Sequence, residues 1–252
     1  MKKLQFILIL CLSFCGYAQN NILFEKGNKA YNEGLYEVAA QEYKNILGKG
    51  EHSSELYFNL GNAYYKLNEI APSIYYYEKA LLLKPNDAEI KNNLAFAQNM
   101  TLDAIEVLPE TSLSKLYRNI TSKLSFDEWA YLSIGFMLLF VLSYILYYFL
   151  SFATQKRIAF ISSFICLFIG LVFIFIAYLE FNKFNTYQPA IVFDEEVIIK
   201  SEPNNRSEET FRLHEGAKVS VIETMNEWQK IKLTDGKTGW LPSKSVKILK
   251  DF

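Results

Sequence analysis

A repeat of 34 residues is the feature that most restricts what this chain can fold into. The same residue recurs one period apart at Phe24/Phe58, Gly27/Gly61, Asn28/Asn62, Tyr31/Tyr65, Tyr43/Tyr77 and Leu47/Leu81. A period of this length is typical of arrays in which each repeat is a pair of helices that packs on its neighbour. The amino-terminal part of the chain is therefore predicted to be a stack of helical hairpins.

The second period carries the residue pattern of two packed helices. Tyr57, Leu60 and Tyr64 share one helical face, and Gly61 lets the partner helix approach closely. Pro85 ends the hairpin because it cannot continue a helix. The pattern resembles the tetratricopeptide (TPR) repeat, a fold that binds partners and is not known for catalysis. The resemblance implies a TPR domain over residues 19–101, with repeats at 20–53 and 54–87 and a capping helix.

A second face on the first helix of each repeat carries Phe, Asn and Tyr. In TPR domains this face lines the concave groove, where asparagine can donate to and accept from a peptide backbone. The resemblance gives these candidate partner-binding residues: Phe24, Asn28, Tyr31, Phe58, Asn59, Asn62, Tyr65, Asn92 and Phe96. Alternatively, the aromatic residues simply pack between helices. Asparagines in an open groove are solvated, so their loss is expected to leave stability almost unchanged.

The amino terminus and two later segments suggest export and membrane insertion. Residues 1–18 are predicted to be a signal peptide, although a lipoprotein modified at Cys15 is an alternative. Residues 130–152 and 158–179 contain no charged residue and are long enough to cross a hydrocarbon core of about 30 Å. They are predicted to be transmembrane helices, the alternative being a buried helix pair in a soluble core.

Charge around these segments predicts their orientation. Lys156 and Arg157 mark the connecting loop, residues 153–157, as cytoplasmic by the positive-inside rule. The TPR domain and the carboxy-terminal region would then lie in the periplasm, on a two-pass protein of the bacterial inner membrane. Residues 102–129 are predicted to form a linker and an amphipathic helix on the membrane surface. A soluble helix that docks on the TPR module is the competing interpretation.

After Leu179 the hydrophobic pattern alternates every second residue, as half-buried strands require. Asp235-Gly236 predicts a tight hairpin, followed by the segment Thr238-Gly-Trp-Leu-Pro242. This order of motifs resembles bacterial SH3-like domains, which are often attached to wall-binding proteins, and implies a small β barrel over residues 188–252. Trp240 is expected in its core. Trp228 is a candidate for the ligand surface.

Catalytic, metal and cofactor sites are not expected. The three cysteines are Cys11, Cys15 and Cys166, none of them in the two predicted periplasmic domains. The two histidines, His52 and His214, lie in different predicted domains, and no phosphate-binding loop is present. A formal net charge of −1 argues against a polyanion-binding surface and so against nucleic acid. The sequence therefore predicts no enzyme, no metal and no cofactor.

The order of these segments resembles the TPR proteins encoded in bacterial aerotolerance (Bat) operons. The resemblance also includes Ile105-Glu-Val-Leu-Pro-Glu110. It implies a multi-domain membrane protein with all-α TPR hairpins, a two-helix transmembrane hairpin and an all-β SH3-like barrel. It also implies a non-enzymatic scaffold that binds envelope proteins, with von Willebrand A-type Bat membrane proteins as partners. The alternative function is binding or sensing of the cell wall, with peptidoglycan as the ligand of the SH3-like domain.

Overall fold

The computed structural model describes residues 22–103 and 111–250, and its chain divides into two compact units. One unit contains the helical repeats together with the β domain that begins at Gln188, and the other spans Leu108–Tyr187. The predicted signal peptide and the whole motif Ile105–Glu110 of the predicted linker lie outside the described residues. The fold class predicted from the sequence is confirmed: a TPR-like helical region, two long apolar helices and an antiparallel all-β sheet.

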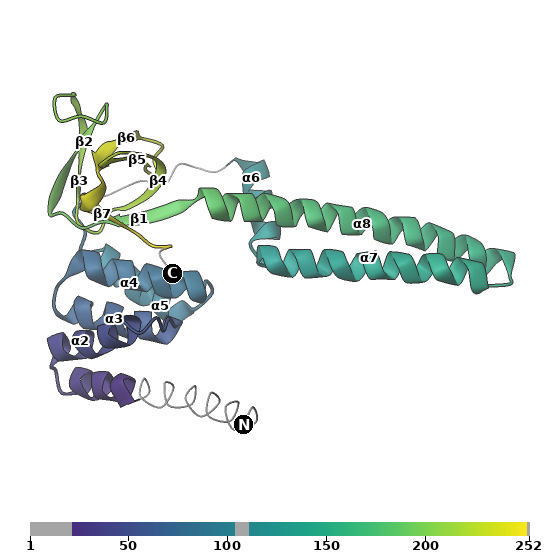
Figure 1. Ribbon diagram of the computed structural model, residues 1–252, viewed down its shortest axis with the longest axis horizontal. Coiled ribbons are helices and arrows are strands. Elements are labelled where there is room, and N and C mark those ends of the chain that lie inside the picture. Colours follow the sequence, from purple (N-terminus) through teal and green to yellow (C-terminus); the bar gives the residue numbers. More distant parts are fainter. Residues whose placement is uncertain (1–21, 104–110, 251–252) are drawn as a thin grey trace, which may run out of the picture. The chain divides into compact units, whose positions relative to one another are not determined.

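The repeats form successive helical hairpins (Figure 1). Residues 22–32 form the first helix, followed by α2 (Tyr36–Leu47), α3 (Ser54–Lys66), α4 (Ile70–Leu83) and α5 (Ala88–Gln98). The Ser53 and Asp87 side chains cap α3 and α5 by accepting hydrogen bonds from backbone N–H groups of the first turn. Gly34 (φ 79°) and Asn68 (φ 60°), one period apart, supply the left-handed turn between the helices of each hairpin.

Glycine sets the spacing of the helices inside each hairpin. A Cβ atom on Gly27 would lie 2.4 Å from the Tyr43 ring, and one on Gly61 would lie 2.6 Å from the Tyr77 ring. Both rings are almost completely buried. Ser73 Oγ also donates a 3.0 Å hydrogen bond to the carbonyl oxygen of Gly61, so the backbone of α3 lies directly against α4. The repeated glycine–tyrosine pairs therefore specify a close approach that a larger residue would prevent.

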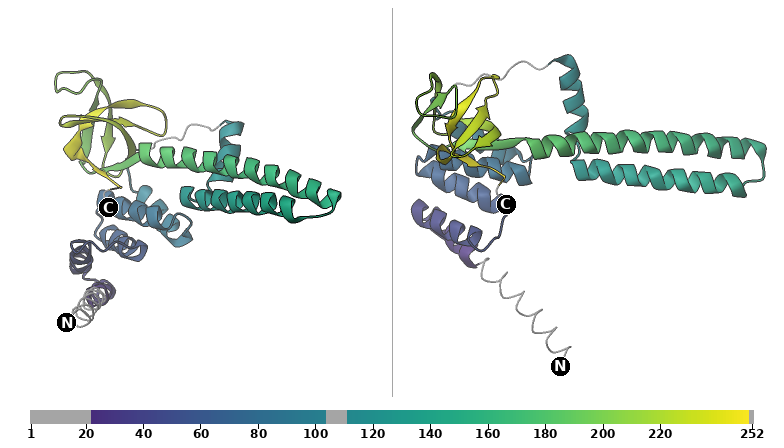
Figure 2. Two further views of the ribbon diagram at one scale, coloured as in Figure 1. Left: turned by 45° about the vertical axis from the view of Figure 1, so that its right-hand side comes forward. Right: turned by 45° about the horizontal axis from the view of Figure 1, so that its top comes forward.

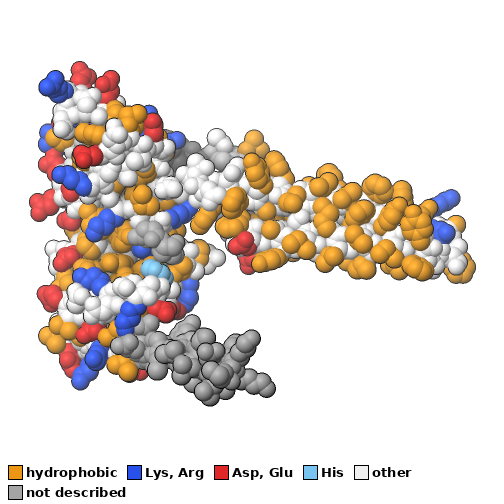
Figure 3. Space-filling view, viewed as in Figure 1, with side chains coloured by type: hydrophobic (Ala, Val, Ile, Leu, Met, Phe, Trp, Pro, Cys, Tyr) orange, Lys and Arg blue, Asp and Glu red, His pale blue; other side chains and the backbone are white. Residues whose placement is uncertain are grey.

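The second unit is a helix pair preceded by a short helix, α6 (Ser112–Thr121). Helices α7 (Phe126–Phe149) and α8 (Ala153–Thr186) pack side by side, and both are long and apolar enough to cross a membrane. Small residues spaced seven apart along α8, Ser163, Gly170 and Ala177, are buried against α7. Ser133 Oγ of α7 donates to the Gly170 carbonyl oxygen at 2.9 Å. Figure 3 shows the apolar surface of this pair.

The turn between α7 and α8 is shorter than the sequence suggested. It comprises residues 150–152, whereas Lys156 and Arg157 lie in the first turns of α8 and not in a loop over 153–157. Leu150 and Phe152 both have extended backbone conformations, which end one helix and begin the next. The residues that follow, Ala153 to Arg157, include good helix formers, so the helix continues through the charged positions.

The β domain is a seven-stranded antiparallel sheet in the order β3-β2-β6-β5-β4-β1-β7. Its strands are β1 (Gln188–Val192), β2 (Glu196–Lys200), β3 (Glu209–His214), β4 (Lys218–Met225), β5 (Trp228–Lys232), β6 (Thr238–Pro242) and β7 (Val246–Ile248). Alternate residues such as Val219, Val221 and Ile231 point into one core. Trp240 is 6% exposed, in agreement with its predicted core position. Gly236, in the predicted hairpin, has φ 91°.

The β domain packs directly on the repeats and shares a hydrophobic core with them. Ile191 and Leu249 of the β domain are fully buried in one cluster with Ile74 and Tyr75 of α4. The Phe193 ring contacts that of Tyr75 edge-on, with centroids 5.6 Å apart. Figures 1 and 2 show β1 next to α4. Two modules that are far apart in the sequence therefore form one folded body.

Polar contacts complete the join between these modules. Asp103 Oδ2 accepts one hydrogen bond from the backbone N–H of His214 at 2.6 Å, and Asp103 Oδ1 lies 2.9 Å from His214 Nδ1. Lys218 Nζ donates to Glu78 Oε2 at 2.7 Å, and the Glu78 carboxylate is almost entirely buried. A buried carboxylate without a partner would be strongly destabilising. The ion pair with Lys218 therefore compensates the burial of Glu78 between the two modules.

Candidate functional site

A cavity of about 250 Å³ lies on the face formed by the first helices of the repeats. Its lining residues are Asn28, Tyr31, Asn32, Tyr43, Asn59 and Asn62. The lining is neutral and consists only of amide and phenol side chains. Such a surface can donate and accept hydrogen bonds without selecting for a charged ligand.

Two asparagines organise the cavity through the same hydrogen bonds, one period apart. Asn28 Oδ1 accepts from the Tyr43 hydroxyl at 2.7 Å and from Asn59 Nδ2 at 3.1 Å. Asn62 Oδ1 accepts from the Tyr77 hydroxyl at 2.6 Å and from Asn93 Nδ2 at 3.1 Å. We call this set the asparagine ladder: Asn28, Tyr43, Asn59, Asn62, Tyr77 and Asn93. Each step joins both helices of one repeat to the first helix of the next.

Burial further disfavours ionisation of the two tyrosines of the ladder, which are neutral near pH 7 in any case. It raises the pKa of Tyr43 to about 12 and also raises the pKa of Tyr77. Both hydroxyls therefore remain donors, and each occupies the Oδ1 atom of its asparagine. Within residues 22–103 and 111–250, the Nδ2 atoms of Asn28 and Asn62 donate to no other protein group. The half-buried asparagines thus keep a donor, two N–H bonds each, for a ligand.

The ladder overturns the expectation that the groove asparagines are independent of stability. The Tyr43 and Tyr77 hydroxyls are buried and bond to Asn28 and Asn62, so truncating these asparagines would remove the acceptors of two buried donors. A buried polar group without a partner costs about 1–3 kcal/mol. The same side chains therefore hold the fold and face the cavity.

The aromatic candidates contribute to packing as well as to the groove wall. The Phe24 ring lies 5.7 Å from that of Tyr43, and Phe58 lies 5.9 Å from Tyr77, centroid to centroid. Tyr31 contacts Tyr36 edge-on, and Tyr65 packs against the cluster that contains Tyr77. All four candidates are half-buried, so each also keeps part of its surface accessible.

The third helix of the array contributes a residue that the sequence interpretation missed. Asn93, not Asn92, donates to Asn62, while Asn92 is exposed one residue away on α5. Phe96 is 60% exposed on the same helix. The signal was present in the sequence, because Asn93 follows Asn59 by the same 34 residues that separate Asn62 from Asn28.

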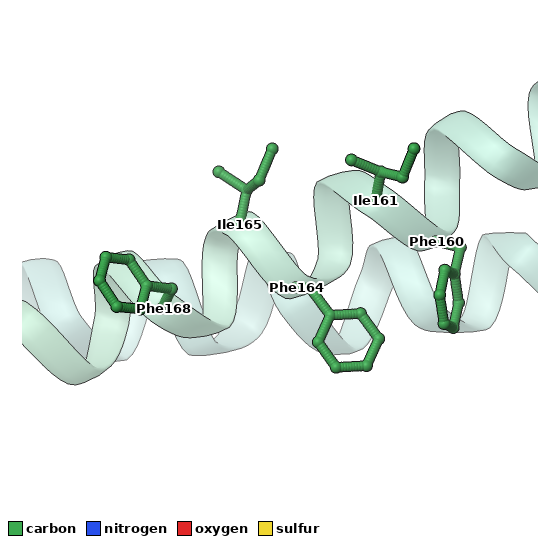
Figure 4. A pocket seen from close by; sticks show the side chains of 5 residues that line it. All are labelled: Phe160, Ile161, Phe164, Ile165 and Phe168. Atoms are coloured by element: carbon green, nitrogen blue, oxygen red, sulfur yellow. The ribbon is translucent and has the colours of Figure 1, made fainter.

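The other surfaces offer less to build a site from. Trp228 is half-buried on β5, opposite Met225 of β4 and Pro242 of β6. Along α8, Phe160, Ile161, Phe164, Ile165 and Phe168 line a shallow hollow of about 390 Å³ and project away from the helix axis (Figure 4). This hollow is purely apolar. Among the described residues, no group of three or more His, Cys, Asp or Glu side chains could hold a metal ion.

Two segments match known protein families. Residues 54–87 match the tetratricopeptide repeat, and residues 195–247 match the bacterial SH3 domain. Both are typically non-catalytic binding modules: the first suggests protein–protein interaction and the second suggests cell-wall binding. No curated protein matches the chain. The folded body of the first unit is thus a TPR-like helical region joined to a β domain that is consistent with the bacterial SH3 fold.

Proposed function

We propose that this protein is a non-enzymatic membrane adaptor that binds an extended segment of partner proteins in its TPR groove. The asparagine ladder carries the proposal, because it repeats with the period of the helices and leaves one amide donor per repeat. A peptide in extended conformation presents carbonyl oxygens at regular intervals, and repeated donors suit it. Phe24 stands where carboxylate-binding TPR domains have lysine, so the groove is assigned to peptide backbone and not to a terminal carboxylate.

The proposed location is a bacterial inner membrane, crossed twice, with both binding modules in the periplasm. The shared core of Ile74, Tyr75, Ile191 and Leu249 supports an even number of crossings, since the modules that contribute it precede and follow the apolar helices. Lys156 and Arg157 favour a cytoplasmic turn. The expected export signal at residues 1–18 agrees with this orientation.

The resemblance to Bat-operon TPR proteins suggests which proteins bind the groove. We propose that envelope proteins, among them von Willebrand A-type Bat membrane proteins, bind the groove as part of an aerotolerance or stress-related membrane complex. The match of residues 195–247 to the bacterial SH3 domain favours a second candidate function, in which that domain binds or senses peptidoglycan. The half-buried Trp228 would then contribute to its ligand surface.

Replacing Asn28 and Asn62 together by aspartate is expected to separate binding from stability. Aspartate keeps the acceptor oxygens for Tyr43 and Tyr77 but lacks the amide donors. Each lost hydrogen bond to a bound peptide costs about 1–3 kcal/mol, so partner recovery from cross-linked membranes should fall at least about tenfold. Thermal unfolding should change little. The double alanine variant should instead lower both recovery and stability.

Asn45→Asp is the matched control for this experiment, because Asn45 is exposed on α2 and does not line the cavity. It makes the same chemical change at one position, adding one of the two negative charges of the double variant, and should leave recovery unchanged. Wild-type recovery by the double aspartate variant would refute the groove assignment. If the full-length chain also sedimented with purified peptidoglycan, that pair of results would favour the wall-binding function.

Single cysteines at Thr154 and Lys237, in a background without the native cysteines, are expected to report opposite sides of the membrane. Thr154 lies in the first turn of α8, and Lys237 is exposed in the turn between β5 and β6. A membrane-impermeant thiol reagent applied to intact spheroplasts should label position 237 and not position 154. Position 154 should become reactive only after permeabilisation. The opposite labelling pattern would invert the proposed topology.

A further inference from the structure

Helix α6 exposes a continuous apolar face. Leu113, Leu116 and Ile120 are 80%, 58% and 48% exposed, and Tyr117 on the same face is 38% exposed. Residues at spacings of three and four lie on one side of a helix, so these side chains form a single stripe. In water this stripe would be unfavourable, since large apolar side chains gain about 1.5–3 kcal/mol each on burial.

The opposite side of α6 is basic. Lys115 and Arg118 lie away from the apolar stripe, Lys123 follows shortly after the helix, and Asp127 and Glu128 come next, in the first turn of α7. A helix with an apolar stripe, a basic face and low overall hydrophobicity has the features of a helix that lies in the headgroup region of a bilayer.

Two hydrogen bonds fix α6 at the end of the helix pair, where charged residues begin. Trp129 Nε1 of α7 donates to the Thr121 carbonyl oxygen at 3.2 Å, in a buried position. The Tyr117 hydroxyl donates to Glu180 Oε1 at 2.9 Å, and Glu180 is the first charged residue after the apolar part of α8. Figures 1 and 2 show α6 running across the direction of α7 and α8. A helix held across two membrane spans at this level lies parallel to the bilayer surface.

The apolar stripe also continues onto the lipid-facing side of α7. Leu124 extends the stripe beyond α6 and lines a hollow of about 700 Å³ with Tyr131, Leu132 and Gly135 of α7, and Glu128 is the α7 lining residue nearest α6 in the sequence. Nothing lies within 4 Å of the position that a Cβ atom on Gly135 would occupy, so the hollow is open there. It has room for an acyl chain next to the apolar stripe of α6.

We propose that α6 binds the anionic phospholipid surface of the bilayer crossed by α7 and α8. Its apolar stripe lies among the upper acyl-chain carbons, and Lys115, Arg118 and Lys123 face the headgroup phosphates. This inference rests on the proposed membrane insertion and adds a lipid-binding surface to it. Two observations favour lipid over the TPR module or a second copy of the chain as the group that covers the apolar stripe. The basic face complements anionic headgroups, and the stripe continues into the hollow on α7.

Single cysteines carrying an environment-sensitive fluorophore test this proposal in the full-length protein, reconstituted in vesicles. Leu113→Cys and Leu116→Cys report the apolar stripe, while Ser114→Cys and Asn119→Cys on other faces of α6 are the matched controls. All four positions are exposed in the structure, so shielding by the protein itself does not distinguish them. We expect positions 113 and 116 to be quenched by lipid-attached quenchers and protected from iodide, and positions 114 and 119 to show the reverse.

The basic face is tested by changing Lys115, Arg118 and Lys123 together to glutamine. In vesicles containing phosphatidylglycerol, each basic residue near the surface should contribute about fivefold to the equilibrium constant for binding of the helix to lipid. The triple variant should lose the gain in lipid quenching at position 113 that phosphatidylglycerol produces over phosphatidylcholine alone. Equal quenching of the wild type in both lipids would overturn the assignment of the basic face.

Two outcomes would overturn the proposal as a whole. Iodide access at positions 113 and 116 would place the stripe in water, and protection from both quenchers would mean that protein covers it. A label at Leu142→Cys, 56% exposed in the middle of α7, separates this failure from that of membrane insertion. Lipid quenching at 142 without lipid quenching at 113 refutes only the role of α6, whereas its absence at 142 refutes insertion.

Discussion

Gly61→Ala is expected to destabilise the repeat module by about 2–4 kcal/mol and to open its groove. The new methyl group would lie 2.6 Å from Cδ1 of Tyr77, a ring that is 1% exposed and therefore has no free space to enter. Moving the ring would also break the hydrogen bond from its hydroxyl to Asn62. Thermal unfolding of the full-length chain in detergent should show the helical transition shifted down by about 10 °C.

Gly48→Ala is the matched control for this change. Gly48 has φ −62° and would bring its Cβ no closer than 3.5 Å to the Lys44 carbonyl oxygen, which is an ordinary contact. It should alter stability by less than about 0.5 kcal/mol. Equal unfolding temperatures for the two variants would show that the Tyr77 ring has room to move, and that the glycine does not set the helix spacing.

Gly216→Ala is expected to separate the β domain from the repeats while each keeps its own fold. Gly216 has φ 83°, and a Cβ atom there would lie 2.8 Å from Cγ2 of Thr101 and 2.9 Å from Cδ1 of Ile74. Ile74 is fully buried and cannot withdraw. Backbone strain and overpacking together should cost about 2–4 kcal/mol. Hydrogen–deuterium exchange should rise in α4 and β1, where the two modules meet, more than in β5.

A substitution at Gly50 measures the contribution of backbone strain alone to the loss of stability. Its φ is 79°, and nothing lies within 4 Å of the position of a Cβ atom. Gly50→Ala should therefore cost only about 1 kcal/mol and leave exchange in α4 and β1 unchanged. If Gly216→Ala behaved like Gly50→Ala, the contact between the modules would not depend on the close approach at Gly216.

Local patterns were sufficient to predict the elements of this fold. The recurrence of glycine and tyrosine at a fixed period predicted two hairpins because helix packing repeats its steric demands in every unit. Uncharged segments predicted the long apolar helices, and two-residue alternation with Asp235-Gly236 predicted strands joined by a tight turn. In each case the determining residues lie within one element or recur at a fixed period.

The interactions between distant residues could not be predicted in this way. Asp103 and His214 are 111 residues apart, and Glu78 and Lys218 are 140 residues apart, so no local pattern relates them. The sequence predicted that asparagine and aromatic residues line the groove. It did not predict the hydrogen bonds between these asparagines and buried tyrosines, because the spacing of Asn28 and Tyr43 does not determine which of their atoms come into contact. The 34-residue period relates Asn59 to Asn93 and not to Asn92, so the period is a better guide to this position than the Phe, Asn and Tyr pattern of a single helix.

The shared core of the first unit has a consequence for the order in which the chain can fold. Ile74 and Tyr75 are synthesised more than a hundred residues before Ile191 and Leu249, which cover them. If α7 and α8 cross the membrane as proposed, this face of α4 stays uncovered until the second helix has inserted and the β domain has been translocated. A chain interrupted before that point would present an apolar surface to envelope proteases. Fully inserted chains would thus be distinguished from incomplete ones by a covered core, which protects them from proteolysis.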